Sequence, residues 1–231
     1  MLQQTQTDRV IPKYREFLQQ FPTVHALAAS SLGDVLRVWQ GLGYNRRARA
    51  LHACARVVVS EYRGVFPRTY EALIELPGIG PYTAGAILAF AFNTAVPIIE
   101  TNIRTVYLHE FFNDKTDVHD RELAALIEET LDRENPRAWY AALMDYGAHL
   151  KKIHGNANVR SRHYTKQSKF EGSDRQIRGA IVRHLGQHAS ETLTMLTHAV
   201  SSEQERVRVQ LEGLIKDGLV MRTGNRYMLA E

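Results

Sequence analysis

The sequence predicts an all-α protein, and two observations carry this prediction. Apolar residues recur at three- and four-residue spacing along most of the 231 residues, as in helices that bury one face. Before residue 200 there is no alternating apolar and polar run long enough to build a sheet. The composition, 44% hydrophobic and 23% charged, is typical of a globular protein. The longest apolar run, residues 84–92, is much shorter than the ~20 residues that a membrane-spanning helix needs.

The same spacing places the helices in the first two thirds of the chain. Apolar periodicity covers 10–21 and 27–39, and Ser31-x-x-Asp34 has the spacing of a capped helix start. A glycine-containing turn at 40–44 separates these segments from the next helix. Further helices are predicted over 46–62, 70–76, 82–92, 102–112, 121–132 and 136–151.

A polar and basic segment over 155–172 interrupts the periodicity and is predicted to be a linker. Beyond it the pattern predicts helices over 174–186, 190–199 and 203–217 and a hairpin that turns at residues 223–225. Ser173-x-x-Gln176 and Ser202-x-x-Glu205 have the spacing of capping boxes. Three helices followed by a hairpin resemble a winged helix-turn-helix module. Such modules bind DNA or mediate protein contacts, and both interpretations stay open.

Positive charge is concentrated in one stretch of a chain whose net charge is only +4. Between Lys151 and Arg183 nine basic residues stand against two acidic ones, so this stretch carries +7. A basic segment of this kind favours a polyanionic partner that binds less tightly as the salt concentration rises. A solvated linker is the alternative interpretation.

The segment 76–87 contains two glycines, Gly78 and Gly80, followed by Pro81. The glycines permit a tight turn between two helices, and proline suits the first turn of the second helix. Backbone N–H groups at such a helix N-terminus bind phosphate without a basic side chain. A turn that only joins and caps two helices is the alternative.

Five motifs occur in a fixed order, at residues 1–6, 41–49, 76–87, 97–102 and 144–148. Together they resemble the helix-hairpin-helix DNA glycosylases, most closely the MutY-type adenine glycosylases. The resemblance covers residues 1 to about 150. It implies a glycosylase domain over 1–154 that lacks the family's first helices, a basic linker over 155–172 and a winged-helix-like domain over 173–231. The family extrudes its target nucleotide from double-stranded DNA.

The resemblance implies several contacts with DNA. Residues matching those that fill the space left by the extruded nucleotide are Gln3, Gln4 and Tyr44, and for Tyr44 a half-buried aromatic after a turn is the alternative. The other expected DNA contacts are Arg46, Arg47, Gly78, Gly80, Thr83, Lys151 and Lys152. For the arginines the alternative is a solvated helix face.

Three residues match the family's catalytic positions. Glu100 stands where the family has an aspartate that stabilises the positive charge developing on the sugar, and Asn102 matches an asparagine near the site. A charge at a helix N-terminus is the alternative role for Glu100. Tyr82 occupies the position of the lysine with which backbone-cleaving relatives form a Schiff base, which implies a monofunctional enzyme.

The chain departs from the family pattern in three places. Cys54 is the single cysteine, so the usual four-cysteine iron–sulfur loop is replaced by a basic run beginning at Lys151, and we expect no cofactor. The family's general-acid glutamate would stand two residues before Met1. We expect a coding start further upstream, since the later motifs are intact, and loss of catalysis is the alternative. The family's domain that reads 8-oxoguanine is replaced by the winged-helix-like segment.

These features predict a monofunctional base-excision-repair glycosylase that removes a mispaired base, with adenine opposite 8-oxoguanine or guanine as the expected substrate. The expected partner is double-stranded DNA with a mismatch or lesion, and the expected location is the cytoplasm, at the nucleoid. One alternative is a thymine or uracil mismatch glycosylase, because a related enzyme also pairs a tyrosine with a carboxylate at these places. The other is a catalytically inactive protein that binds distorted DNA on the same scaffold.

Overall fold

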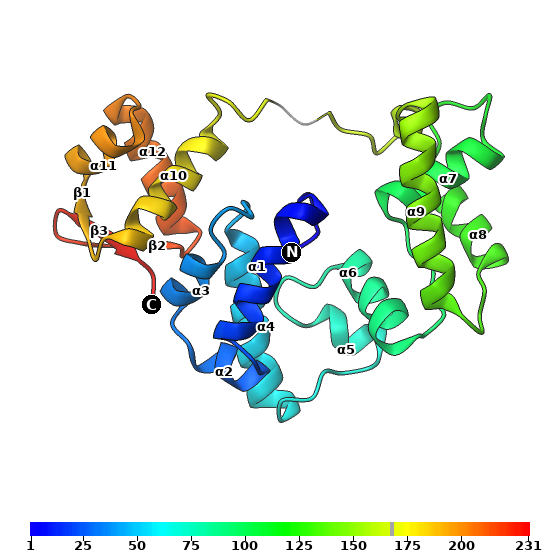
Figure 1. The fold of residues 1–231 in the computed structure, drawn as a ribbon, viewed down its shortest axis with the longest axis horizontal. Coiled ribbons are helices and arrows are strands. Elements are labelled where there is room, and N and C mark those ends of the chain that lie inside the picture. Colours follow the sequence, from blue (N-terminus) through cyan, green and yellow to red (C-terminus); the bar gives the residue numbers. More distant parts are fainter. Residues whose placement is uncertain (167–168) are drawn as a thin grey trace. The chain divides into compact units, whose positions relative to one another are not determined.

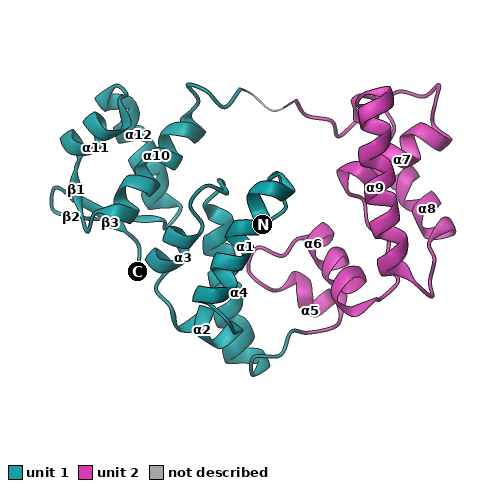
Figure 2. Ribbon diagram, in the orientation of Figure 1, with its two compact units in different colours: residues 1–66, 168–231 teal, residues 67–167 magenta. Residues whose placement is uncertain are grey.

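The computed structural model of the protein describes residues 1–166 and 169–231. The described chain is mainly helical, as predicted, and forms two compact units (Figures 1 and 2). Unit 1 contains residues 1–66 and 168–231, and unit 2 contains residues 67–167. The predicted domain boundaries divide the chain differently and stay a prediction. In the described residues no helix combines the length and the apolar character that crossing a membrane requires.

The first part of unit 1 contains four helices, and short polar side chains start two of them. The hydroxyl of Thr23 accepts a hydrogen bond from the backbone N–H of Ala26, and Ser31 accepts one from Asp34, as its spacing predicts. The helices are α1 (Thr7–Gln20), α2 (Val24–Ala29), α3 (Leu32–Val38) and α4 (Arg46–Tyr62).

The second part of unit 1 combines three helices with a small antiparallel sheet of strand order β1-β3-β2. Its elements are α10 (Asp174–Gln187), β1 (Glu191–Thr192), α11 (Leu193–Val200), α12 (Gln204–Lys216), β2 (Val220–Thr223) and β3 (Arg226–Leu229). The predicted hairpin is present, and Gly224 turns it with a φ of +60°. The helix predicted over 190–199 is partly wrong, because Glu191 and Thr192 pair with β3 before the helix begins.

Both predicted capping boxes in this part are wrong. The Ser173 hydroxyl donates to the carbonyl of Phe170 instead of capping α10. Helix α12 begins one residue later than its pattern predicts, so Glu203 occupies the N-cap in place of Ser202. In both cases the residue spacing matches a capping box, but the serine hydroxyl does not accept a hydrogen bond from the first turn of the helix.

The two parts of unit 1 share one apolar core. Leu36 of α3 and Trp39, directly after this helix, lie in the same buried cluster as Ile181 and Leu185 of α10. The guanidinium of Arg37 also donates from α3 to the carbonyl of Gly186, at 3.1 Å. The C-terminal helices and sheet therefore complete the core of the N-terminal helices.

Unit 2 contains the glycine-rich motif and the segments that follow it. Its elements are α5 (Tyr70–Ile74), α6 (Pro81–Ala86), a π-helix η1 (Ile87–Ala91), α7 (Thr101–Phe111), α8 (Asp120–Thr130), α9 (Pro136–His154) and a 3-10 helix η2 (Ala157–Arg160). Buried side chains of α7, α8 and α9 form its core, among them Ile103, Ile127 and Tyr140.

Part of the predicted linker is folded onto unit 2. Asn158 is buried, and its amide donates to the hydroxyl of Thr105 at 2.8 Å and to the carbonyl of Thr101 at 3.2 Å. Val118 and Ser161 form an isolated β-bridge. The polar composition of this segment thus reflects hydrogen bonding to α7 and not only exposure. Residues 167 and 168 of the predicted linker lie outside the described residues.

Candidate active site and nucleic-acid interface

Glu100 is the N-cap of α7, and its carboxylate accepts a hydrogen bond from the backbone N–H of Asn102 at 2.6 Å. The extended backbone of Glu100 directs the side chain over the first turn of the helix, where N–H groups lack intrahelical partners. The alternative role of Glu100 as a helix-terminal charge is therefore present in the structure. This bond uses one carboxylate oxygen, so the capping role is compatible with a chemical role for the other.

Tyr82 lies in the first turn of α6 and is 38% exposed. Partial burial and the negative charge of Glu100 both raise the pKa of Tyr82 above its ordinary value. The phenol consequently keeps its proton at neutral pH. Unit 2 thus contains all three predicted catalytic residues: Glu100 is bonded to Asn102, and its charge acts on Tyr82.

The predicted DNA contact Lys151 joins this group from the last turn of α9. Its ammonium donates to the side-chain oxygen of Asn102 at 3.5 Å. Lys152, the next residue, is exposed. One cation of the basic run therefore lies beside the predicted catalytic group.

Gly147 permits the close approach of α9 to the N-terminus of α7. A Cβ at this position would lie 2.1 Å from the carbonyl oxygen of Asn102, well inside any permitted contact. Gly147 belongs to the motif at residues 144–148, but no role was predicted for it from the sequence. A glycine in the middle of a predicted helix is the signal that indicates such an approach.

Tyr140 fixes the extended segment that leads to Glu100. Its hydroxyl donates to the carbonyl of Val96 at 2.7 Å and accepts from the N–H of Ile98 at 3.1 Å. Burial raises the pKa of Tyr140 to about 12, so the hydroxyl stays available as a donor. No sequence pattern distinguishes Tyr140 from any other buried aromatic residue.

The glycine-rich motif forms the expected turn between α5 and α6. Gly78 has a φ of +74°, which favours glycine, and Pro81 occupies the first position of α6 after the N-cap Gly80. Gly80 has an ordinary negative φ, and a Cβ there would meet open space. The turn therefore requires glycine at 78 but not at 80. Thr83 follows in the first turn of α6.

The second group of predicted site residues lies in unit 1. Gln3 and Gln4 are exposed in the N-terminal turn. Tyr44 is 40% exposed and is the last residue of the turn at 40–44. Gln4 and Tyr44 both have a positive φ, of 58° and 49°, a conformation that is uncommon for residues other than glycine. Arg175 of α10 donates to the Tyr44 hydroxyl at 3.0 Å, a contact that the sequence did not reveal.

Arg47 holds the two turns of this group together. Its guanidinium donates to the carbonyl of Gln3 at 2.7 Å and to that of Leu42 at 3.0 Å, and it lies over the rings of Trp39 and Tyr44. Burial lowers the pKa of Arg47 below its ordinary value. These contacts give Arg47 a structural role in the free protein, and its contact with phosphate stays a prediction.

Arg46 is also paired within unit 1. It forms a two-bonded ion pair with Asp217, both bonds at 2.7 Å, and Arg178 binds the same carboxylate. The two arginines hold the pKa of Asp217 below its ordinary value. The acidic partner comes from the end of α12, so the local sequence around Arg46 could not indicate it.

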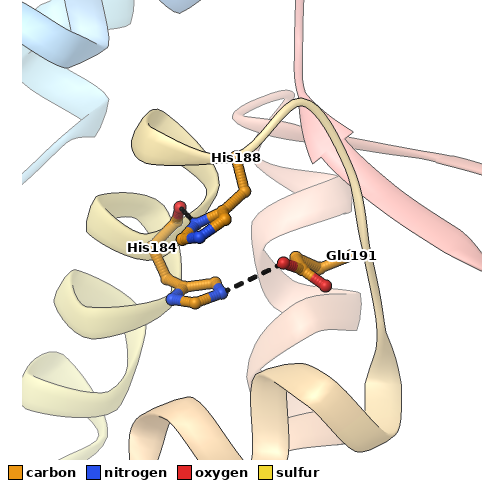
Figure 3. A group of neighbouring side chains, drawn as sticks. All are labelled: His184, His188 and Glu191. Carbon is orange, nitrogen blue, oxygen red and sulfur yellow. Dashed lines mark hydrogen bonds and ion pairs between the residues drawn. The ribbon is translucent and has the colours of Figure 1, made fainter.

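One further cluster contains metal-ligating side chains: His184, His188 and Glu191, at the end of α10 and in β1 (Figure 3). The sequence did not single out this cluster, because the glutamate belongs to a strand that was predicted as helix. It lies in unit 1, whereas the predicted catalytic group lies in unit 2.

Unit 2 therefore holds a carboxylate and a tyrosine beside a helical hairpin, and a lysine that contacts the neighbouring asparagine, an arrangement that suits chemistry on a polyanion. The chain belongs to the HhH-GPD superfamily of base excision DNA repair proteins, which matches residues 1–133.

Named relatives and solved structures are consistent with this membership. The chain is 34% identical to an adenine DNA glycosylase of Mycolicibacterium smegmatis over 100% of this chain and 85% of that protein. It is 39% identical to an adenine DNA glycosylase of Homo sapiens, over 64% of this chain but only 28% of that longer protein. Among solved structures it is similar to a thermostable thymine-DNA glycosylase, with a TM-score of 0.55 and 25% identity over 64% of this chain and 69% of that one.

Proposed function

We propose that the protein is an adenine DNA glycosylase that hydrolyses the N-glycosidic bond of adenine mispaired with 8-oxoguanine or guanine in double-stranded DNA. The observation that carries the proposal is the carboxylate of Glu100, fixed on the Asn102 N–H in unit 2 of a HhH-GPD protein, with its charge acting on Tyr82. The relatives named adenine DNA glycosylase support adenine as the base.

The chemistry we propose for Glu100 is electrostatic. Departure of the base develops positive charge on the deoxyribose, and a fixed carboxylate stabilises that charge without reorganising. The bond from the Asn102 N–H holds one carboxylate oxygen in place and leaves the other for the sugar or for the attacking water. Because glutamate has one methylene more than the family's aspartate, this cap also limits how far its longer side chain can move.

Tyr82 and Lys151 have supporting roles in this proposal. The neutral phenol of Tyr82 lines the pocket and donates a hydrogen bond without adding charge. Lys151 keeps the Asn102 side chain oriented and, together with Lys152, attracts phosphate. Tyr82 at the position of the Schiff-base lysine supports hydrolysis to an abasic site without cleavage of the DNA backbone.

The proposed grip on DNA uses the turn at Gly78 and Gly80 and the first turn of α6 at Thr83. Nothing within the described residues crowds the position of a Cβ at Gly80, and its φ suits any residue. A glycine there is explained if a DNA phosphate approaches the backbone closely. In unit 1, Gln3, Gln4 and Tyr44 are proposed to contact the duplex where the nucleotide leaves it.

We propose that the segment 173–231 is a winged-helix module, with β2 and β3 as its wing. The order of α10, β1, α11, α12, β2 and β3 and the antiparallel three-stranded sheet support this interpretation. Its basic residues Arg175 and Arg178 already bind Tyr44 and Asp217 within unit 1. Their engagement favours a role for the module in supporting the N-terminal helices.

The test is a single-turnover assay of the protein expressed from its natural coding start, on labelled duplexes that contain adenine opposite 8-oxoguanine, adenine opposite guanine, thymine opposite guanine, or matched pairs. We expect breaks in the adenine-containing strand only after alkali treatment, since alkali cleaves abasic sites. Breaks without alkali would contradict the monofunctional mechanism.

The same panel separates the two other candidate functions. Excision of thymine alone would identify a thymine mismatch glycosylase, which the similarity to the thermostable thymine-DNA glycosylase favours as the second candidate. Binding of the mismatched duplex without excision of any base, measured by fluorescence anisotropy, would identify a catalytically inactive binder and overturn the proposal.

A further inference from the structure

We propose that His184, His188 and Glu191 bind a divalent transition metal, with zinc as the best fit. The two histidines are four residues apart, on the last turn of α10 and directly after it, and Glu191 belongs to β1. Helical spacing of four places both imidazoles on one face, where the His188 ring stacks on that of His184 and His184 points toward Glu191 (Figure 3). A pair of imidazoles with one carboxylate is a ligand set that zinc binds in proteins.

The distances suit a metal centre. One potential ligand atom from each of the three side chains lies within 4.8 Å of the other two. Nε2 of His184 and Oε1 of Glu191 are 3.4 Å apart, and two ligands of a tetrahedral zinc ion with bonds of about 2.0–2.1 Å are also separated by about 3.4 Å. Only His188 has to turn inward, and it is exposed and therefore unhindered on its outer side.

Glu191 provides the independent observation that points to a cation. The residue is only 5% exposed, yet its Oε2 is buried and has no hydrogen-bond partner within the described residues. Leaving a buried charged oxygen unpaired is costly, and native proteins seldom tolerate it. The contact with His184 involves only Oε1. A metal ion bound by the carboxylate would compensate the second oxygen.

One ring nitrogen of His188 is engaged by the backbone, which leaves the other for a metal. Its Nδ1 lies 2.9 Å from the carbonyl oxygen of His184 and can donate a hydrogen bond to it. A histidine that donates from one ring nitrogen to a backbone carbonyl keeps the lone pair of the other nitrogen for a metal. The rings of His184 and His188 are stacked, with centroids 4.1 Å apart.

The metal would join the end of α10 to β1, and a three-residue ligand set leaves one position for water. Because β1 pairs with β3, the metal would stabilise the sheet of the C-terminal segment. The competing explanation is an ion pair between protonated His184 and Glu191 with no metal. That pair accounts for Oε1 but not for the buried Oε2.

The test is titration of the untagged, chelator-treated full chain with zinc chloride by isothermal calorimetry at neutral pH. We expect one zinc per chain at micromolar or lower Kd, and an affinity at least about tenfold weaker in Glu191→Gln and in His188→Gln. His198→Gln, on the exposed surface of α11, is the matched control and should bind like the wild type.

Thermal unfolding provides the second readout, since a ligand that binds only the folded state raises the midpoint. Zinc should raise the midpoint of the wild type and of His198→Gln but not that of His188→Gln, and magnesium should raise none. If the Glu191→Gln protein fails to fold, zinc binding is still compared between the wild type and His188→Gln, because His188 is exposed. Absence of zinc binding by the wild type, or binding that His188→Gln leaves unchanged, would overturn the proposal.

Discussion

Two roles are predicted for the Glu100 side chain, and they are compatible with each other. Its sequence context predicted either a carboxylate facing the sugar or a charge at a helix N-terminus, and the structure shows the second directly. The charge of Glu100 also helps to raise the pKa of Tyr82, the predicted pocket residue. The two roles make different demands, because a helix cap needs an acceptor whereas stabilisation of a sugar cation needs a negative charge.

Charged residues were harder to interpret from the sequence than apolar ones. Arg46 and Arg47 lie on the predicted helix, but their partners are Asp217, far along the chain, and backbone carbonyls of two turns. Long flexible side chains take whatever acceptor the tertiary structure brings near. Local sequence predicts the position of such a residue but not its partner.

Cys54 permits a prediction at the residue scale. The thiol is buried in α4, and burial raises its pKa to about 11. Because the thiolate is the reactive form, the native protein should react with a disulfide reagent at pH 8 at least about a hundredfold more slowly than the unfolded chain. The check is the rate of absorbance change with and without guanidinium chloride, and equal rates would contradict the buried thiol.

At the scale of elements, apolar spacing predicted the helices well because burial of one face is a local periodic signal. Helices α4, α7, α8 and α9 lie within a few residues of their predictions. The run at 82–92 forms α6 followed by the π-helix η1, a change of hydrogen bonding that apolar spacing does not encode. Strand β1 was missed because its two residues depend on pairing with β3.

The approach of α7 and α9 gives a prediction with a matched control. Gly147→Ala would place a methyl group against the carbonyl of Asn102, so we expect a loss of about 1–3 kcal/mol in the free energy of unfolding. Gly179→Ala in α10 meets open space and should gain about 0.5–1 kcal/mol from better helix propensity.

Denaturant unfolding followed by circular dichroism measures both variants. The displaced Asn102 should also lower the excision rate of Gly147→Ala, whereas Gly179→Ala should retain it. A Gly147→Ala protein as stable and as active as Gly179→Ala would show that the two helices do not depend on this contact.

At the scale of the whole molecule, the sequence predicted the order of the segments but not how they share a core. The residues from 173 onward are predicted to be a winged-helix-like domain, and the sequence does not indicate that Ile181 and Leu185 lie in one buried cluster with Leu36 and Trp39. Apolar periodicity indicates that one face of a helix is buried, but it does not indicate which element that face packs against. The motif at 76–87, by contrast, was interpretable because its residues act locally: glycine permits a positive φ, and proline fixes its own φ.

The central claim is that the negative charge of Glu100 acts on the sugar of the target nucleotide. The direct test compares Glu100→Gln, Glu100→Asp and Glu129→Gln in single-turnover excision of adenine opposite 8-oxoguanine. Glutamine can still accept a hydrogen bond but carries no charge, aspartate keeps the charge and is a favoured N-cap, and Glu129 is an exposed control at the end of α8.

We expect Glu100→Gln to lower the excision rate at least about a hundredfold while its thermal midpoint and DNA affinity stay near those of the wild type. Glu100→Asp should retain most of the rate, and Glu129→Gln should match the wild type. Excision by Glu100→Gln at the wild-type rate would restrict Glu100 to capping α7 and contradict the proposed mechanism.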